Sequence, residues 1–208
     1  MWHPAEHLAA FRGVLQVDGY AGFKRLAGNR TDASVSLAVC WAHMRRKFYD
    51  FHTATKSPLA AEVLKRIRTL YEIEAEIRGH PAEHRRQARS RPIVDALYVW
   101  LQDHAGRVSS ASGLAEAIRY ALRHWSGLLV FLGDGRVEMD TNTVERAIRP
   151  ITLGRKNALF AGNDGGARHW AIALPLIQAA KLNGVDPMAY LTDVLERVVS
   201  GRTKAHAL

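Results

Sequence analysis

The stretch that decides the fold is Gly13-Val14-Leu15-Gln16-Val17-Asp18-Gly19-Tyr20. Its opening run is apolar, contains β-branched residues and ends at a turn signal, so it predicts a short strand that delivers Asp18 to its end. A second strand is predicted at Val35 to Cys40, and one or two helical turns at Gly22 to Leu26 lie between the strands. The expected sheet is therefore small.

A helical block follows, because the apolar spacing changes from Pro58 onward. The first predicted helix runs from Pro58 to near Gly79 and carries its charges on the face opposite its apolar residues. A second helix is expected around Ile93 to Leu101, ending at Gly106, and a third covers Leu114 to Leu132. The fold class is therefore an α-rich α+β arrangement. The apolar positions of the first helix are Leu59, Val63, Ile67, Leu70, Ile73 and Ile77.

The remainder of the chain predicts three more helices with loops between them. Asp140-Thr141-Asn142 is expected to start the helix that carries Glu145, and Arg149-Pro150 is expected to end it. A loop over Gly162 to Gly166 precedes a helix from Arg168 to Leu182 that Pro175 kinks. Finally, Asn183-Gly184 supplies a left-handed stop, and Asp186-Pro187 opens a last helix that ends near Val199.

Composition indicates one substantial core and a polyanionic partner. The chain has 208 residues, of which 48% are hydrophobic, and its 29 lysines and arginines against 20 acidic residues give a net charge of +9. Such a surplus favours nucleic acid, because cations that neutralise phosphates release counterions. One cysteine, Cys40, leaves no internal disulfide and fits a reducing cytoplasm. The apolar stretches are all shorter than a membrane span, so no membrane step is expected.

Two carboxylates stand out, and each also has a purely structural explanation. Asp18 at a strand end is well placed for a ligand, yet an Asp before Gly is more often a turn residue that bonds its own backbone. Asn142-Thr143-Val144-Glu145 has the spacing of a capping box, which explains Glu145 without chemistry. Glu145 and Arg149 are also one helical turn apart and could form an ordinary ion pair.

Basic clusters provide candidate phosphate contacts. His43 precedes Met44-Arg45-Arg46-Lys47, where contact with phosphate competes with a solvated basic face. Gly154-Arg155-Lys156-Asn157 is a second cluster for which phosphate binding is a reasonable expectation. The basic run around Arg85 to Arg91 is most simply a hydrated helix face. Cys40 lies in an apolar run without a second cysteine, so a buried structural thiol is favoured over a nucleophile or a metal ligand.

Read in order, these motifs resemble the insertion-sequence-66 family of DDE transposases. The matching blocks are spread from about residue 8 to residue 197 of the chain. They are Leu15 to Phe23, Cys40-Trp41-Ala42-His43-Met44-Arg45-Arg46-Lys47-Phe48, Asn142 to Pro150, Gly154 to Gly162, and Lys181-Leu182-Asn183-Gly184-Val185-Asp186-Pro187 with Tyr190-Leu191.

The resemblance implies a fold, a metal and a partner. It implies an incomplete ribonuclease H-like core at residues 1–57, a helical insertion at 58–132 and the remainder of the core at 133–208. In that family three acidic residues hold two magnesium ions for DNA strand cleavage and transfer, and by motif match Asp18 is the second of them and Glu145 the third. DNA at element ends and targets is the implied partner, with a homo-oligomer or accessory transposition proteins possible. The implied contacts to DNA are His43, Arg45, Arg46, Arg146, Arg149, Arg155 and Lys156.

One departure from the family pattern leaves two functions open. The first catalytic aspartate of the family lies in an earlier strand, and neither Glu6 nor Asp32 has the required context. Three outer strands of the sheet are also expected to be missing, which leaves the Asp18 strand with an unpaired edge. The chain is therefore expected to be either a transposase fragment of doubtful activity alone, or a non-catalytic DNA-binding or assembly module. Only the second predicts DNA affinity that depends on salt but not on metal.

Overall fold

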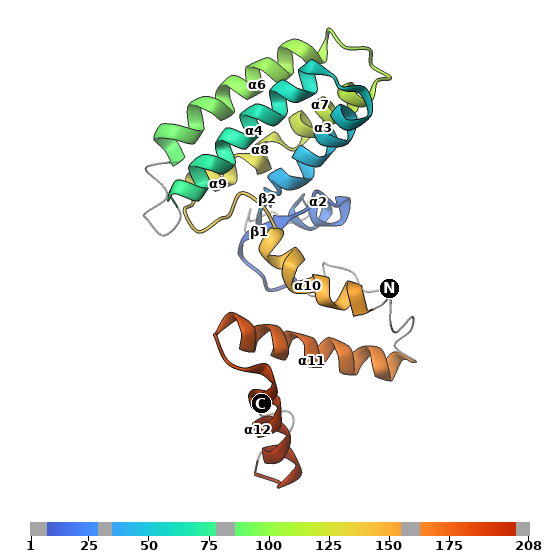
Figure 1. Cartoon of the computed structure of the whole chain (residues 1–208), viewed down its shortest axis with the longest axis vertical. Helices are drawn as coiled ribbons and strands as arrows, with labels where there is room; N and C mark the ends of the chain where they lie inside the picture. Colours follow the sequence, from blue (N-terminus) through green and yellow to red (C-terminus); the bar gives the residue numbers. More distant parts are fainter. Residues whose placement is uncertain (1–7, 29–34, 78–85, 155–162, 203–208) are drawn as a thin grey trace. The chain divides into compact units, whose positions relative to one another are not determined.

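The computed structural model describes residues 8–28, 35–77, 86–154 and 163–202 (Figure 1). The chain divides into two compact units, Met1–Thr143 and Val144–Leu208. Both strands and the helices up to α9 belong to the first unit, and helix α10 begins in the first unit and continues into the second. The division at residues 57 and 132 that the sequence suggested stays a prediction. Among the described residues, no helix has the length and apolar character needed to cross a membrane.

The sheet of the first unit contains β1 (Gly13–Val17) and β2 (Val35–Val39), which are parallel. Their register pairs Gly13 with Val35 and Val17 with Val39. Helix α2 (Ala21–Gly28) lies between them in the sequence, as a crossover between parallel strands requires. Both predicted strands are confirmed, and so is the α-rich α+β fold class. Because parallel strands end at the same edge, the residues after Val17 and Val39 lie next to each other.

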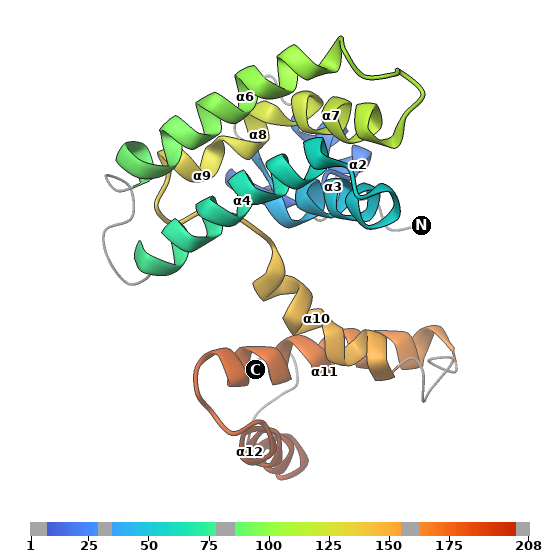
Figure 2. The same cartoon turned by 45° about the horizontal axis from the view of Figure 1, so that its top comes forward.

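Four long helices of the first unit pack together over the strands (Figures 1 and 2). They are α3 (Trp41–Thr55), α4 (Pro58–Ile77), α6 (Arg91–Ala105) and α7 (Gly113–Arg123). A short π-helical turn, η1 (Arg86–Ser90), leads into α6. The apolar stripe predicted for the first helix of the block is confirmed, since five of its six positions are buried in α4 together with the neighbouring Ala60. The five are Val63, Ile67, Leu70, Ile73 and Ile77.

Trp41 lies at the centre of the core, where β2 gives way to α3. Its side chain is fully buried, and its indole Nε1 donates a hydrogen bond of 2.9 Å to the carbonyl of Leu128. The rings of Trp125 and Phe131 meet it edge to face, at centroid distances of 6.2 and 5.8 Å. The buried donor is therefore satisfied while its aromatic faces remain in apolar contact.

The single helix predicted from Leu114 to Leu132 is wrong, because the structure divides it into three pieces. After α7 come α8 (Trp125–Leu128) and α9 (Val130–Gly133), and the break falls at His124, whose φ and ψ are −105° and 9°. Gly127 of α8 lies directly against β2: a Cβ there would come 2.6 Å from Val39 Cγ2 and 3.0 Å from the carbonyl oxygen of Leu37. Contact between α8 and β2, together with the rings around Trp41, overrides the continuous helical periodicity.

Helix α10 (Asn142–Gly154) continues through Pro150, so the predicted end at Arg149-Pro150 is wrong. A proline removes one helical N–H, and here the helix continues beyond it. The helix after it, α11 (Asp164–Leu182), begins earlier than predicted. Asn163 caps it by accepting a 2.8 Å hydrogen bond from the amide of Gly166, so the described end of the glycine-rich segment forms a helical turn instead of a loop.

The end of the second unit agrees with its sequence signals. Pro175 lies inside α11, and the helix stops at Asn183, with Gly184 at a φ of +69°. Helix α12 (Pro187–Val199) follows and packs against α11. Asp186 caps α12 through a 2.8 Å hydrogen bond that its Oδ1 accepts from the amide of Ala189. The predicted end of α11 and the predicted start of α12 are therefore both confirmed.

We predict that Leu97→Ala lowers the free energy of unfolding by about 2 to 5 kcal/mol, because it leaves a cavity in the packed core. Leu97 is fully buried in α6, whereas Val99, two residues on, is 65% exposed. Val99→Ala is the matched control on the same helix and is expected to change stability by less than about 0.5 kcal/mol. Urea denaturation of both variants checks this, and equal losses contradict the described packing.

Candidate DNA-cleavage site at the strand edge

Asp18 follows β1 directly and is exposed at the edge where both parallel strands end. Its Oδ1 accepts a 2.9 Å hydrogen bond from the amide of Tyr20, and its carbonyl oxygen accepts a 3.1 Å hydrogen bond from the hydroxyl of Tyr120. Gly19 has a φ of +95°, and a Cβ there would lie 2.6 Å from that hydroxyl. The turn after β1 therefore requires glycine and is held in place by α7.

Asp18 does bond its own turn, as the structural explanation of this residue expects. The carboxylate can still accept other hydrogen bonds or a metal ion, because an ionised aspartate offers about four lone-pair positions. Its side chain is exposed at the carboxyl end of a parallel strand, which is where ligands bind in such sheets. The geometry is thus compatible with both the turn role and a metal-binding role.

The segment that leads into α10 is bonded to this same strand edge. The side-chain amide of Gln16 in β1 donates to the carbonyl oxygens of Glu138 and Asp140, at 2.5 and 3.0 Å. The amide of Trp41 donates to the carbonyl oxygen of Met139 at 3.1 Å. Although more than 100 residues separate the two segments, residues 138–140 run beside the ends of both strands. Residues 138–140, which precede α10 in the sequence, are therefore held at the strand edge near Asp18.

Cys40 completes this attachment as a buried structural thiol, the role that its apolar context favoured. Its Sγ accepts hydrogen bonds from both the amide and the hydroxyl of Thr141, each at 3.3 Å. The amide of Cys40 in turn donates to the carbonyl oxygen of Val17 at 3.0 Å. Cys40 thus joins β1, the end of β2 and the residue before α10.

Asp140, and not Asn142, organises the start of α10, so the predicted capping role of Asn142 is wrong. Asn142 is already helical, and Asp140 Oδ1 accepts a 2.9 Å hydrogen bond from its amide while Oδ2 accepts one from its side-chain amide at 2.5 Å. The hydroxyl of Tyr71 in α4 also hydrogen-bonds the Asp140 carboxylate. Burial, followed by the charge of Asp140 and this hydrogen bond, raises the pKa of Tyr71 far above its ordinary value.

The predicted basic residues lie on two helices. His43 is half-buried and Arg45 and Arg46 are exposed in α3, which starts at the strand edge. The guanidinium of Arg45 stacks over the ring of Tyr49 at 5.4 Å. Glu145, Arg146 and Arg149 are all exposed on α10, within the second unit. Arg155 and Lys156, like Glu6 and Asp32, lie outside the described residues.

The described part of the basic run before α6 agrees with a hydrated helix face, the structural explanation of these residues. Arg89 pairs with Glu76 at 2.6 Å, and Arg91 pairs with Asp95 at 3.0 Å.

Sequence reasoning missed Gln16, Tyr71 and Asp140 as parts of the site. Each of them places a polar group against a backbone or side-chain group that is distant in the sequence. No local sequence motif marks such a contact. The Asp140-Thr141-Asn142 triplet was the only available signal.

Two family models match the chain and together cover nearly all of it. The model described as the transposase IS66 family matches residues 1–169, and the one described as the IS66 C-terminal element matches residues 176–207. The first match includes the strand edge, the helical block and α10. The second covers the end of α11 and all of α12.

Relatives of the chain occur in Sinorhizobium fredii. The uncharacterized protein y4jD is 48% identical over 207 residues, which is 97% of this chain and 40% of that protein. The uncharacterized protein y4qI is 47% identical over 204 residues, which is 95% of this chain and 38% of that protein. The chain thus spans about 40% of the length of these relatives. No solved structure matches the chain.

We predict that Tyr71→Phe flattens the dependence of stability on pH above about pH 10, the ordinary tyrosine pKa. The raised pKa of Tyr71 means that the folded state keeps its proton where the unfolded state loses it. Tyr71 therefore contributes stability that is complete below about pH 10 and is lost as the pH rises towards its folded-state pKa. Urea unfolding across alkaline pH measures this, with Tyr49→Phe, at an exposed tyrosine, as the control. Identical profiles for the two variants contradict the Tyr71–Asp140 contact.

Proposed function

The chain belongs to the IS66 family of transposases, and we propose that it supplies Asp18 and Glu145 to metal-dependent cleavage and transfer of DNA strands. The observation that carries this proposal is the attachment of residues 138–141 to the strand edge at Asp18. Glu145 follows this segment in the sequence, on α10, which begins at Asn142. The ribonuclease H-like core that the family implies needs such a meeting of strand end and helix.

Magnesium fits the donor chemistry of this proposal. Asp18 and Glu145 are exposed carboxylates, and Mg²⁺ prefers oxygen ligands while keeping several waters, so few protein ligands are needed. When bound, a pair of such ions activates an attacking oxygen and stabilises the leaving oxygen of a phosphodiester. In the chain itself, Gln16 and Cys40 hold the segment before α10, and the Tyr20 amide orients Asp18.

The basic residues of α3 and α10 are proposed to hold the DNA backbone. His43, Arg45 and Arg46 lie on α3, which begins at the strand edge. Arg146 and Arg149 lie on α10, the helix that carries Glu145. Arginine can bind a phosphate through two parallel hydrogen bonds, which positions the strand without reading its sequence. Arg155 and Lys156 are proposed to extend these contacts. A second copy of the chain or accessory transposition proteins are further proposed partners.

A non-catalytic DNA-binding module is the second candidate. The net charge of +9 favours it directly, and so does the structural role that Asp18 already has in its turn. This function needs the basic surfaces but neither carboxylate. It differs from the first in one measurable respect, because its DNA affinity falls with salt and is independent of divalent metal.

We predict that Asp18→Asn and Glu145→Gln each lower cleavage of a duplex carrying the element's end by about 100-fold or more. The reason is that metal-assisted charge stabilisation provides several kcal/mol, and each 1.36 kcal/mol changes the rate tenfold. Cleavage is measured with Mg²⁺ or Mn²⁺ for this chain alone and for a chain extended upstream through the family's first aspartate segment. Activity is expected in the extended chain.

Asp50→Asn and Glu196→Gln are the matched controls, since both residues are exposed on helices α3 and α12. They are expected to leave the cleavage rate of the extended chain unchanged. If neither chain cuts while both bind DNA independently of metal, the catalytic proposal fails and the binding module takes its place.

A further inference from the structure

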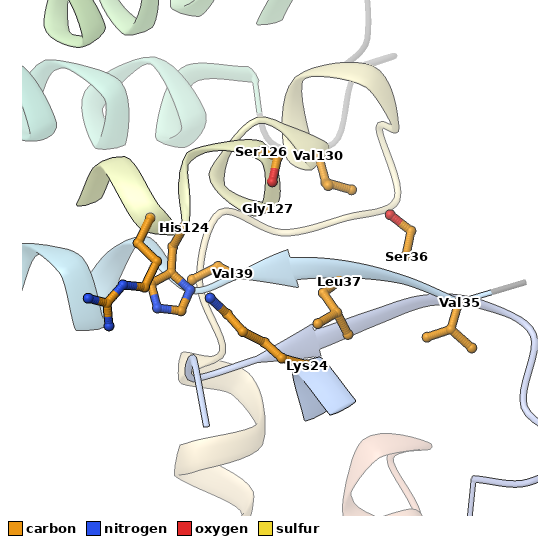
Figure 3. A pocket seen from close by; sticks show the side chains of 10 residues that line it. Lys24, Val35, Ser36, Leu37, Val39, His124, Ser126, Gly127 and Val130 are labelled. Atoms are coloured by element: carbon orange, nitrogen blue, oxygen red, sulfur yellow. The ribbon is translucent and has the colours of Figure 1, made fainter. Parts of the chain in front are cut away.

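A cavity of about 320 Å³ opens beside β2, on the side formed by α2 and α8 (Figure 3). Its apolar floor consists of Val35, Leu37 and Val39 on β2, with Gly127 and Val130 behind them. Its polar lining comes from α2, β2, α8 and the end of α7. These contributors are Lys24 of α2, Ser36 of β2, Arg123 at the end of α7, His124 at the break after it, and Ser126 of α8.

His124 is an unusual residue for a cavity wall. It is 6% exposed, and its Nδ1 has no hydrogen-bond partner in the part of the chain that the structure describes. A buried polar atom without a partner is destabilising, so such an atom in a cavity wall indicates a missing partner. Figure 3 shows the ammonium end of Lys24 pointing to the His124 ring.

Two basic side chains, Lys24 and Arg123, lie near this histidine. Among the described residues, neither Lys24 nor Arg123 forms an ion pair with a carboxylate. Burial, together with the charges of Lys24 and Arg123, lowers the pKa of His124 below its ordinary value. Among the described residues that line the cavity, Lys24 and Arg123 carry positive charge and none is acidic. An anionic ligand would satisfy all three groups.

The cavity is linked to Asp18 through one aromatic contact. The ring of Tyr120 packs against His124 with centroids 4.5 Å apart, and its hydroxyl donates to the carbonyl oxygen of Asp18. A Cβ on Gly19 would lie 3.4 Å from His124 Cε1. The imidazole thus lies against the turn that presents Asp18. An anion held here is next to the strand edge and within the first unit.

We propose that Lys24, Arg123 and His124 form a seat for a phosphate of the DNA backbone beside Asp18. The identity of the ligand as DNA rests on the proposed function, whereas the anion preference rests on the cavity alone. The apolar floor accepts a sugar face, and the cations at the wall neutralise one phosphodiester. Such a contact fixes the strand without reading its bases.

Binding of phosphate changes the titration of His124 in a defined direction. The charged or titratable groups on the elements around its ring are Lys24 from α2, Arg123 and Tyr120 from α7, and Asp18 in the turn after β1. At the cavity, β2 and α8 present apolar side chains and hydroxyls. A phosphate offsets the two cations and accepts a hydrogen bond from the imidazolium. The pKa of His124 therefore rises when the seat is filled.

The first test measures binding of a short blunt DNA duplex to the full chain in EDTA over a range of salt. Lys24→Gln with Arg123→Gln is expected to weaken binding about tenfold and to reduce the salt slope by about 1, the value for one lost phosphate contact. The matched control is Arg25→Gln with Arg119→Gln, which removes equal charge from the same two helices outside the cavity. Equal weakening by both pairs overturns the seat.

The second test follows the ring resonances of His124, assigned with His124→Gln, during titration with inorganic phosphate and then with the duplex. The expected result is a titration midpoint that moves up with either probe. A midpoint unchanged by both overturns the proposal, and one raised by phosphate but not by the duplex overturns its assignment to DNA. Neither test uses metal or cleavage, so loss of the seat leaves the Asp18 and Glu145 assignments standing, and their loss leaves the anion seat standing.

Discussion

The hydrogen bonds between the start of α3 and residues 139–141 are the constraint on which the rest of the structure depends. Trp41 donates its amide to Met139 and its indole to Leu128, and Cys40 accepts from Thr141 through its sulfur. These contacts join segments that are 87 to 101 residues apart. Closing so long a loop costs conformational entropy, which the buried aromatic cluster around Trp41 offsets. Without these hydrogen bonds, the position of the start of α10 relative to the Asp18 edge is not fixed.

The helical block between residues 58 and 132 is part of this core. Ile67, Leu70 and Ile118 are packed with Val17 and Val39 in one buried cluster. Tyr71 extends from α4 to the Asp140 carboxylate, and Tyr120 extends from α7 to the backbone of Asp18. Each side of the proposed catalytic edge is therefore supported by a tyrosine from the block. A helical block of this kind can determine where the site residues lie without providing any carboxylate itself.

Local signals in the sequence predicted local structure well. The β-branched run at Gly13–Val17, the stripe along α4 and the Asp186 cap each depend on neighbouring residues, and each was confirmed. The break at His124 depends on packing, and the continuation of α10 through Pro150 depends on tolerance of a lost hydrogen bond. The periodicity of apolar residues reports neither. Lys24, Arg123 and His124 form no motif, because Lys24 in α2 is far in the sequence from the other two at the end of α7. The family resemblance named Asp18 and Glu145 but could not supply Gln16, Tyr71 or Asp140.

Binding of Mn²⁺, measured by electron paramagnetic resonance in the presence of cleavage-site duplex, tests the central claim most directly. The chain with Asp18→Asn, the chain with Glu145→Gln and the double variant complete a double-mutant cycle. If both carboxylates hold the same ions, each single variant weakens Mn²⁺ binding and the double variant is little weaker than either. Fully additive losses, or no loss in either single variant, contradict a shared metal site at this strand edge.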